Sequence, residues 1–414
     1  CSMVWSHGSA TAESPAKYMG TGSCSSSNCH GGVKPRKSGN VLQNEYVTWH
    51  KYDKHSKAWT VLTSQDSKRI AYHLGIADAT RAPECLRCHA TYVSDKQRHG
   101  ESYEIEDGIS CESCHGAAEH WLASHTARDA THTDNVKRGM TDLGNASQRA
   151  ALCLDCHYGA SDRAVTHRLI GAGHPRLSFE LDTFSMIQPA HWEFDADYAK
   201  RKGEYRSADA WLWGQITQAL RTVEHVLAAQ RSDNLFPEFT DFYCYACHHS
   251  LTGDQWKRRE YGGTPGDPRY NMSSLVMVVE ALTVLSPPLA QKLQAELANL
   301  HQARQRDAAG ETLKAISSML NGSVRGRLLK KHISEQDVSR LLKHMTSFAA
   351  KADHPQYEDA EQAAMAISAL LASMPSGQEP YMSQIESMYA SLEDEERFKA
   401  GEFTAAARKL LSRL

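Results

Sequence analysis

Five pairs of cysteines, each followed directly by a histidine, are the residues of this 414-residue chain whose types and spacing could do chemistry. Four pairs have the spacing Cys-x-x-Cys-His, and the fifth has the looser spacing Cys-x4-Cys-His. Two thiols on one tight turn can add to the two vinyl groups of a porphyrin, and the histidine that follows can bind the iron as its proximal ligand. The spacing therefore predicts covalent attachment of five haem c groups.

The predicted attachment residues are Cys24, Cys29, Cys85, Cys88, Cys111, Cys114, Cys153, Cys156, Cys244 and Cys247. The predicted proximal ligands are His30, His89, His115, His157 and His248. Structural zinc is the competing interpretation of paired cysteines. It does not explain a histidine after every pair, so haem is the better hypothesis.

The residue at the sixth position of each iron decides what the haem can do. A second histidine gives a low-spin electron carrier, whereas an open position allows a substrate to bind. The chain has 22 histidines, so seventeen remain once the proximal ligands are assigned. The predicted distal ligands are His55, His120, His167, His174 and His191. The rivals are His50, His99, His125 and His249, whereas His301, His332, His344 and His354 are expected at the surface.

The apolar pattern predicts a mainly α fold, with a haem-organised core that has little β structure and a helical domain after it. Helices are expected over residues 42–62 and 208–230, where apolar residues follow helical spacing. The glycines and prolines of residues 262–268 mark a boundary. Beyond it there are no cysteines, and Ser334 with Asp337 resembles a capping box that opens one of several amphipathic helices. We expect a tether over residues 1–20, a pentahaem domain over 21–260 and an α-helical domain over 268–414.

Composition and the remaining cysteine bear on where the protein works. A formal net charge of −3 offers no basic face for nucleic acid, and no run of eighteen apolar residues spans a membrane. Covalent haem is attached outside the bacterial cytoplasm, so we expect an extracytoplasmic protein. Cys1 is the one unpaired cysteine, and a mature lipoprotein begins with a lipidated cysteine. Lipidation of Cys1 would anchor the protein in the periplasm or at the outer membrane; the alternative is that the chain starts at a cysteine by chance.

Several of these features resemble a known group of proteins. The first motif is followed by Trp49, Asp53, His55 and Ala58, and His120 lies five residues after the third motif. This order is similar to that of the multihaem cytochromes related to the nitrifiers' tetrahaem cytochrome c and to hydroxylamine oxidoreductase. The resemblance covers about residues 20–250. It implies closely packed haems, most of them bis-histidine, with His55 and His120 at positions that supply distal ligands there.

The chain also departs from that group. Its five motifs exceed those of the tetrahaem member and are fewer than those of the octahaem enzymes, and the helical part after Gly263 has no counterpart. No tyrosine cross-link site is identifiable, which argues against hydroxylamine oxidation. The leading hypothesis is therefore an electron relay whose partners are redox proteins, such as a quinol-oxidising complex or other cytochromes. The alternatives are a reductase of small nitrogen or sulfur oxides with one five-coordinate haem, and a haem-wire subunit of a larger complex or filament.

Overall fold

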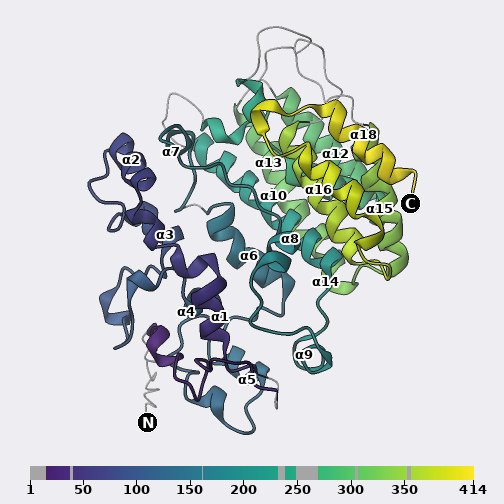
Figure 1. Ribbon diagram of the computed structural model, residues 1–414. Helices are drawn as coiled ribbons and strands as arrows, with labels where there is room; N and C mark the ends of the chain where they lie inside the picture. The colour runs from purple at the N-terminus through teal and green to yellow at the C-terminus, as the bar shows by residue number, and fades with distance from the viewer. Residues whose placement is uncertain are drawn as a thin grey trace, which may run out of the picture.

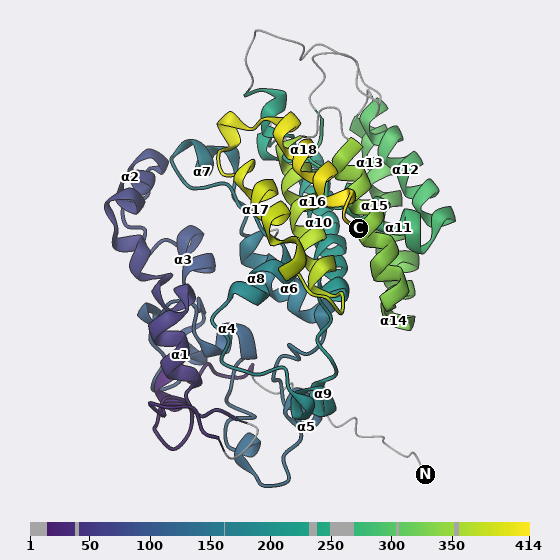
Figure 2. The same cartoon turned by 45° about the vertical axis from the view of Figure 1, so that its right-hand side comes forward.

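The computed structural model of this chain describes residues 15–37, 41–160, 162–231, 238–248, 269–303, 306–351 and 356–414. Within these ranges the protein consists of α-helices, short 3-10 turns and loops, and extended segments pair only as isolated bridges. The predicted mainly α fold is confirmed. Figures 1 and 2 show a region of short helices and long loops from the first half of the chain, lying beside a bundle of longer helices from the second half. No helix among the described residues has both the length and the apolar character needed to cross a membrane.

The first region contains short helices with little apolar core between them. They are α1 (Glu45–Tyr52), α2 (Gln65–Leu74), α3 (Pro83–His89), α4 (Cys111–His115), α5 (His132–Lys137), α6 (Ala146–His157), α7 (His167–Gly171), α8 (Leu181–Ile187) and α9 (Ala196–Lys202). Their ends are set locally. For example, the Ser64 hydroxyl accepts a hydrogen bond from the Ser67 N–H at the start of α2, and the helix ends at Gly75 with φ 73°. Two small apolar clusters, around Leu86 and around Leu154, hold these helices together.

The predicted helix over residues 42–62 was wrong in extent. Helix α1 ends at Tyr52, because the backbone of Asp53 is extended, with φ −85° and ψ 124°. The Asp53 carboxylate then accepts the N–H of His55 and starts a new 3-10 turn over Lys54–Lys57. A short polar side chain that satisfies the backbone locally favours such a break over a continuous helix. The turn directs His55 away from the face of α1.

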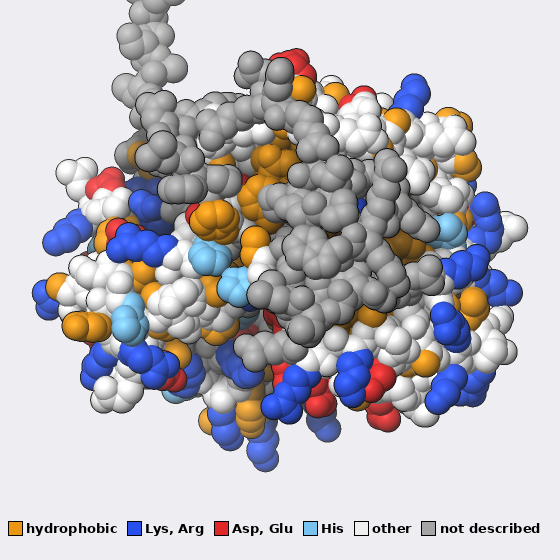
Figure 3. Space-filling model, turned by 90° about the horizontal axis from the view of Figure 1, so that it is seen from above, with side chains coloured by type: hydrophobic (Ala, Val, Ile, Leu, Met, Phe, Trp, Pro, Cys, Tyr) orange, Lys and Arg blue, Asp and Glu red, His pale blue; other side chains and the backbone are white. Residues whose placement is uncertain are grey.

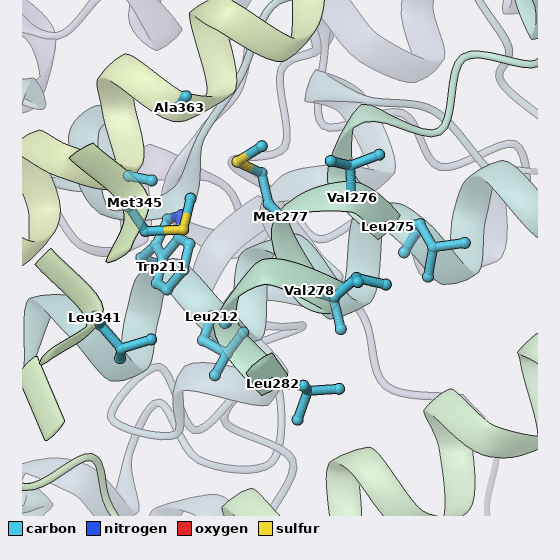
Figure 4. Packing of buried hydrophobic residues seen from close by; sticks show 14 of the residues in the cluster. Trp211, Leu212, Leu275, Val276, Met277, Val278, Leu282, Leu341, Met345 and Ala363 are labelled. Atoms are coloured by element: carbon cyan, nitrogen blue, oxygen red, sulfur yellow. The ribbon is translucent and has the colours of Figure 1, made fainter. Parts of the chain in front are cut away.

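The second region is a bundle with one large hydrophobic core. Its helices are α10 (Ser207–Arg231), α11 (Ser273–Leu285), α12 (Pro287–Gln302), α13 (Arg306–Met319), α14 (Arg325–Lys330), α15 (Glu335–Lys351), α16 (Tyr357–Ala372), α17 (Met382–Ala390) and α18 (Ala400–Leu411). The prediction of a helix over residues 208–230 is confirmed by α10. In Figure 4, Trp211 of α10, Met277 of α11 and Met345 of α15 lie close together in this core, and all three side chains are fully buried.

Helix α10 connects the two regions. It packs against α6 and α8 of the first region and against α11, α13 and α16 of the bundle. At the start of α15, the Ser334 hydroxyl accepts the N–H of Asp337 at 3.2 Å, which confirms the predicted N-terminal cap. Residues 262–268, Cys1 and the first fourteen residues of the expected tether lie outside the described residues.

Candidate functional site

Three of the five cysteine–histidine motifs are helical and place both thiols on one side. Helices α3 and α4 end at His89 and His115, and α6 ends at His157. On a helix, residues three apart share a face, so the two cysteines of each of these motifs point the same way. The motif that ends at His248 begins with a 3-10 turn, and the one that ends at His30 is an irregular turn after residues 21–23. None of the ten motif cysteines forms a disulfide.

Gly116, which follows α4, shows how tightly this turn is built. Its φ is 81°, a left-handed value that favours glycine, and a Cβ added there would lie 2.8 Å from the carbonyl oxygen of Gly139. The close approach lets the Thr141 N–H donate to the His115 carbonyl at 2.9 Å. The chain after the third motif is thereby folded back over its histidine.

Each motif histidine lies opposite a second histidine from a distant part of the chain. We number the sites 1 to 5 by motif order, with His30, His89, His115, His157 and His248 as their motif histidines. The ring centroids are 6.2 Å apart for His30 and His125, 6.4 Å for His89 and His174, 6.3 Å for His115 and His191, 5.8 Å for His157 and His55, and 6.0 Å for His248 and His167. The five separations are nearly equal although the interplanar angles range from 12° to 88°.

This common separation matches two imidazoles bound to one metal ion. With metal–nitrogen bonds of about 2.0–2.1 Å on opposite sides, the ring centres are roughly 6 Å apart. Ordinary aromatic pairs also span these separations and angles, so the distinguishing feature is that each motif histidine faces another histidine. A paired thiol and an opposed imidazole at every motif histidine are the donor set that a covalently bound haem requires, so the residues present fit that group.

The structure brings four of the five predicted distal histidines into these pairs. They are His55, His167, His174 and His191. His120 is exposed, and the ring opposite His30 is that of His125. The chain turns at the buried Trp121, and the His125 N–H donates to the Trp121 carbonyl at 2.9 Å, so both side chains lie on the inner side of the turn. The spacing of a buried tryptophan and a histidine four residues on was the signal that could have identified His125.

The other candidate histidines have different surroundings. His50 stacks on Tyr46, and the His99 ring donates to the carbonyl of Val93 and stacks on Tyr103. His249 and His354 lie outside the described residues. His332 and His344 pair with the carboxylates of the bundle residues Asp209 and Glu280.

One histidine of the bundle departs from the expected surface position. His301 is half-buried, with its Nε2 atom enclosed; its Nδ1–H donates to the Leu297 carbonyl at 3.0 Å, and burial lowers its pKa. It lies on the apolar side of α12, which contacts α11 and α13. The expectation that it is a surface residue was wrong, because a histidine that satisfies its own ring N–H within the helix can be buried at modest cost.

Five of the ten paired histidines have an acceptor at the outer ring nitrogen, whereas the Nδ1 of His191 is buried without a hydrogen-bond partner. The Nδ1–H groups of His89, His125 and His174 donate to the backbone carbonyls of Ala58, Leu122 and Pro175, at 2.9, 2.5 and 2.8 Å respectively. The Nδ1–H of His30 donates to Glu45 Oε2 at 2.9 Å, and that of His55 donates to Asp53 Oδ1 at 2.9 Å. A proton fixed on Nδ1 leaves the Nε2 lone pair free toward the opposite ring, which is the arrangement of metal-binding histidines.

Burial keeps several of these rings in the neutral form that a metal requires. Desolvation and the neighbouring His191 lower the pKa of His115 to about 3. Desolvation and His55 lower the pKa of His157 to about 4. The same desolvation lowers the pKa of His89 and of His191. Four of the ten paired rings are therefore neutral at pH 7 without any metal present.

The attachment sites also lie next to one another. The thiols of Cys24 and Cys111 are close neighbours, which places site 1 beside site 3. The thiols of Cys88 and Cys156 are also close neighbours, which places site 2 beside site 4. The Cys114 thiol of site 3 is buried near the Cys153 thiol of site 4.

Site 5 is held by the helical bundle. The Cys244 N–H donates to Glu358 Oε1 at 3.3 Å, and the Tyr243 hydroxyl donates to Asp359 Oδ1 at 2.7 Å. Both carboxylates lie in the first turn of α16. Arg176 pairs with Glu361 at 3.1 Å and with Glu395 at 3.0 Å, so a cation balances this acidic group.

The Cys244 thiol and two carboxylates of this group, those of Glu358 and Glu395, are also close enough to hold a metal ion. The thiol belongs to an attachment motif, and Glu395 is already paired with Arg176. We therefore assign this group to site 5.

The paired rings are not all enclosed, because His248 is exposed. Figure 3 shows histidine side chains at the molecular surface among hydrophobic ones.

Comparison with known proteins gives a partial family match. Residues 23–116 match the family described as cytochrome c554 and c-prime. No curated protein and no solved structure matches the chain. The matched segment contains sites 1, 2 and 3, each with its thiol pair and histidine. The motifs and this match together support one conclusion: the chain is a c-type cytochrome, a haem-bearing electron carrier.

Proposed function

We propose that this protein is an extracytoplasmic pentahaem cytochrome that relays electrons through bis-histidine haems. The observation that carries the proposal is the second histidine opposite each motif histidine, at 5.8 to 6.4 Å between ring centroids. The paired cysteines would hold each porphyrin through thioether bonds, and the two imidazoles would hold the iron. When bound, each haem supplies reversible one-electron oxidation and reduction.

The adjacency of the sites supports a relay. Contacts between thiols connect site 1 with site 3, site 3 with site 4, and site 4 with site 2. Site 5 continues this series, because His167 and His174, which face sites 5 and 2, both belong to the short segment 167–174. A relay needs each cofactor within close reach of the next, and this chain places its attachment residues in such a series.

The histidine pairs favour a relay over a reductase. A reductase needs one iron with an open sixth position where the substrate binds. Here an imidazole faces each of the five motif histidines, including His89 of site 2, which faces His174. A second imidazole at all five sites therefore supports electron transfer, without a site where a substrate binds to iron.

Location and partners follow from the chemistry of attachment. Thioether-linked haem is assembled outside the bacterial cytoplasm, so the protein would work in the periplasm or at the outer membrane. A quinol-oxidising complex or another cytochrome would exchange electrons with it there.

The test of the function is a spin-state census of the haem-loaded protein. The pyridine haemochrome assay should give five haems per chain. Electron paramagnetic resonance of the oxidised protein should show only low-spin iron, and the reduced protein should not bind carbon monoxide. A high-spin signal or carbon monoxide binding in one haem of five would overturn the relay and support a reductase.

A further inference from the structure

The five sites differ in the charge of the groups that hold their histidines. At site 2, both Nδ1–H groups donate to neutral carbonyls, those of Ala58 and Pro175. At site 1, the Nδ1–H of His30 donates to the carboxylate of Glu45. At site 4, His55 faces His157, and the Nδ1–H of His55 donates to the carboxylate of Asp53.

Both carboxylates are fixed by further hydrogen bonds. Asp53 is 4% exposed, its Oδ1 also accepts the His55 backbone N–H at 2.9 Å, and its Oδ2 accepts the Gln188 side-chain amide at 3.0 Å. Glu45 is 16% exposed in its side chain, and its Oε1 accepts the Gln43 backbone N–H at 3.1 Å. Neither group can turn away from its histidine without losing these bonds.

A carboxylate at this place changes the electron density of the ligand. It draws the Nδ1 proton toward itself, so the imidazole becomes a stronger donor to the iron than one held by a carbonyl. Reduction adds one electron to the iron, breaks no bond and leaves the Nδ1 proton between ring and carboxylate. A stronger donor and a nearby negative charge both favour the oxidised iron, because they oppose the added electron in a poorly solvated site.

We propose that Glu45 and Asp53 are positioning residues that lower the reduction potentials of sites 1 and 4 below that of site 2. The inference rests on the proposed bis-histidine haems. Site 4 borders site 2 through Cys156 and Cys88, so two neighbouring sites differ in potential. That difference gives the relay a direction, from site 4 toward site 2.

The experiment is a redox titration of the haem-loaded full chain, followed by optical absorption and electron paramagnetic resonance. Glu45→Gln and Asp53→Asn each remove one negative charge and keep a similar shape. Each should raise the potential of the haem whose histidine it holds by roughly 59 mV, which corresponds to a tenfold change in the equilibrium constant of a one-electron couple. The potential of site 3, whose His191 lies near both carboxylates, should rise by less. The signals lost in His125→Ala and His55→Ala variants identify which haem belongs to site 1 and which to site 4.

A matched control comes from a half-buried histidine–carboxylate pair. Asp142 contacts His132 at 3.0 Å, and His132 is not one of the ten paired rings. Asp142→Asn should leave all five potentials unchanged. An equal shift in this control, or no shift in Glu45→Gln and Asp53→Asn with five low-spin haems retained, overturns the proposal.

If a carboxylate variant fails to load haem, a third variant that should lower the reduction potential of site 4 still tests the proposal. Gln188→Leu removes a hydrogen-bond donor from Asp53 Oδ2, which leaves more negative charge to act on His55. The potential of site 4 should then fall. An unchanged or higher potential of site 4 in Gln188→Leu overturns the proposal. High-spin iron in the unmodified protein would instead overturn the bis-histidine function itself. The two failures are therefore distinguishable.

Discussion

The rings of His30 and His125 lie 6.2 Å apart and are nearly parallel, with an interplanar angle of 12°. They come from opposite ends of a 95-residue stretch of chain, and each is held at its outer nitrogen, His30 by Glu45 and His125 by the Leu122 carbonyl. The backbone of residues 121–125 is itself fixed by the buried Trp121. Site 1 is therefore assembled by two independently supported imidazoles.

Replacing His125 by alanine should open the sixth position of one haem. We expect five attached haems, one high-spin signal and newly acquired carbon monoxide binding, because the thiols and His30 remain. His120→Ala is the matched control, and its spectrum should stay low-spin, since that side chain is exposed. A high-spin haem in the His120 variant and none in the His125 variant would reverse the assignment.

Sequence reasoning identified the parts of each site that are local. Two thiols and one histidine lie within a single turn, so the spacing of Cys85, Cys88 and His89 is enough to predict an attachment site. The opposite histidine comes from far along the chain, and only the packed structure selects it. His174 was a predicted ligand because of its glycine-flanked turn, but its pairing with His89 could not be read from that turn.

The break in the predicted helix over residues 42–62 has the same origin. Apolar spacing favoured one long helix, whereas the hydrogen bond from the His55 N–H to Asp53 favours a new turn. A side chain that competes with the helical backbone overrides the periodic pattern. The bundle helices were easier to predict, because helices such as α15 are amphipathic and pack their apolar face against neighbouring helices.

Replacing His174 by alanine tests site 2 separately. His174 is only partly buried, so its loss should leave a solvent-accessible sixth position on one haem. We expect carbon monoxide to bind about one haem of five in the reduced variant, with the fold retained. His50→Ala, on the exposed face of α1, should bind none. An all-low-spin His174 variant would mean that another ligand faces His89.

The buried Asp241 predicts a dependence of stability on pH. Burial and the nearby Glu238 raise the pKa of Asp241 to about 7 from its ordinary value of 3.8. The folded state therefore holds a proton that the unfolded state releases between these values, so stability falls as pH rises from about 4 to about 7. Asp241→Asn removes this penalty, which is on the order of 4 kcal/mol at pH 8.

Urea unfolding of the haem-loaded protein at two pH values checks this effect. The variant and the unmodified protein should differ little at pH 3.5, where both states are protonated, and the variant should be more stable at pH 8. Asp197→Asn, a change at an exposed carboxylate on α9, serves as the control and should show no such pH-dependent gain. Equal stabilities of Asp241→Asn and unmodified protein at pH 8 would contradict the buried charge.

Arg176 tests whether the bundle supports site 5. Its guanidinium carries ion pairs to Glu361 and Glu395, and these carboxylates with Glu358 raise its pKa despite burial. Arg176→Met keeps much of the side-chain volume but leaves the carboxylates without their cation. We expect the free energy of unfolding to fall by about 2 kcal/mol, because a half-buried charge that loses its partner is costly.

The same variant should alter the signal of site 5, because Glu358 contacts the backbone of Cys244. Arg201→Met is the control: it removes an ion pair with Asp197 within one helix, which contributes about 0.5 kcal/mol or less. If Arg176→Met loses stability while all five signals stay as they were, Arg176 stabilises the bundle alone. If the site 5 signal shifts in Arg176→Met and not in Arg201→Met, contacts from the helical bundle support the fifth haem site.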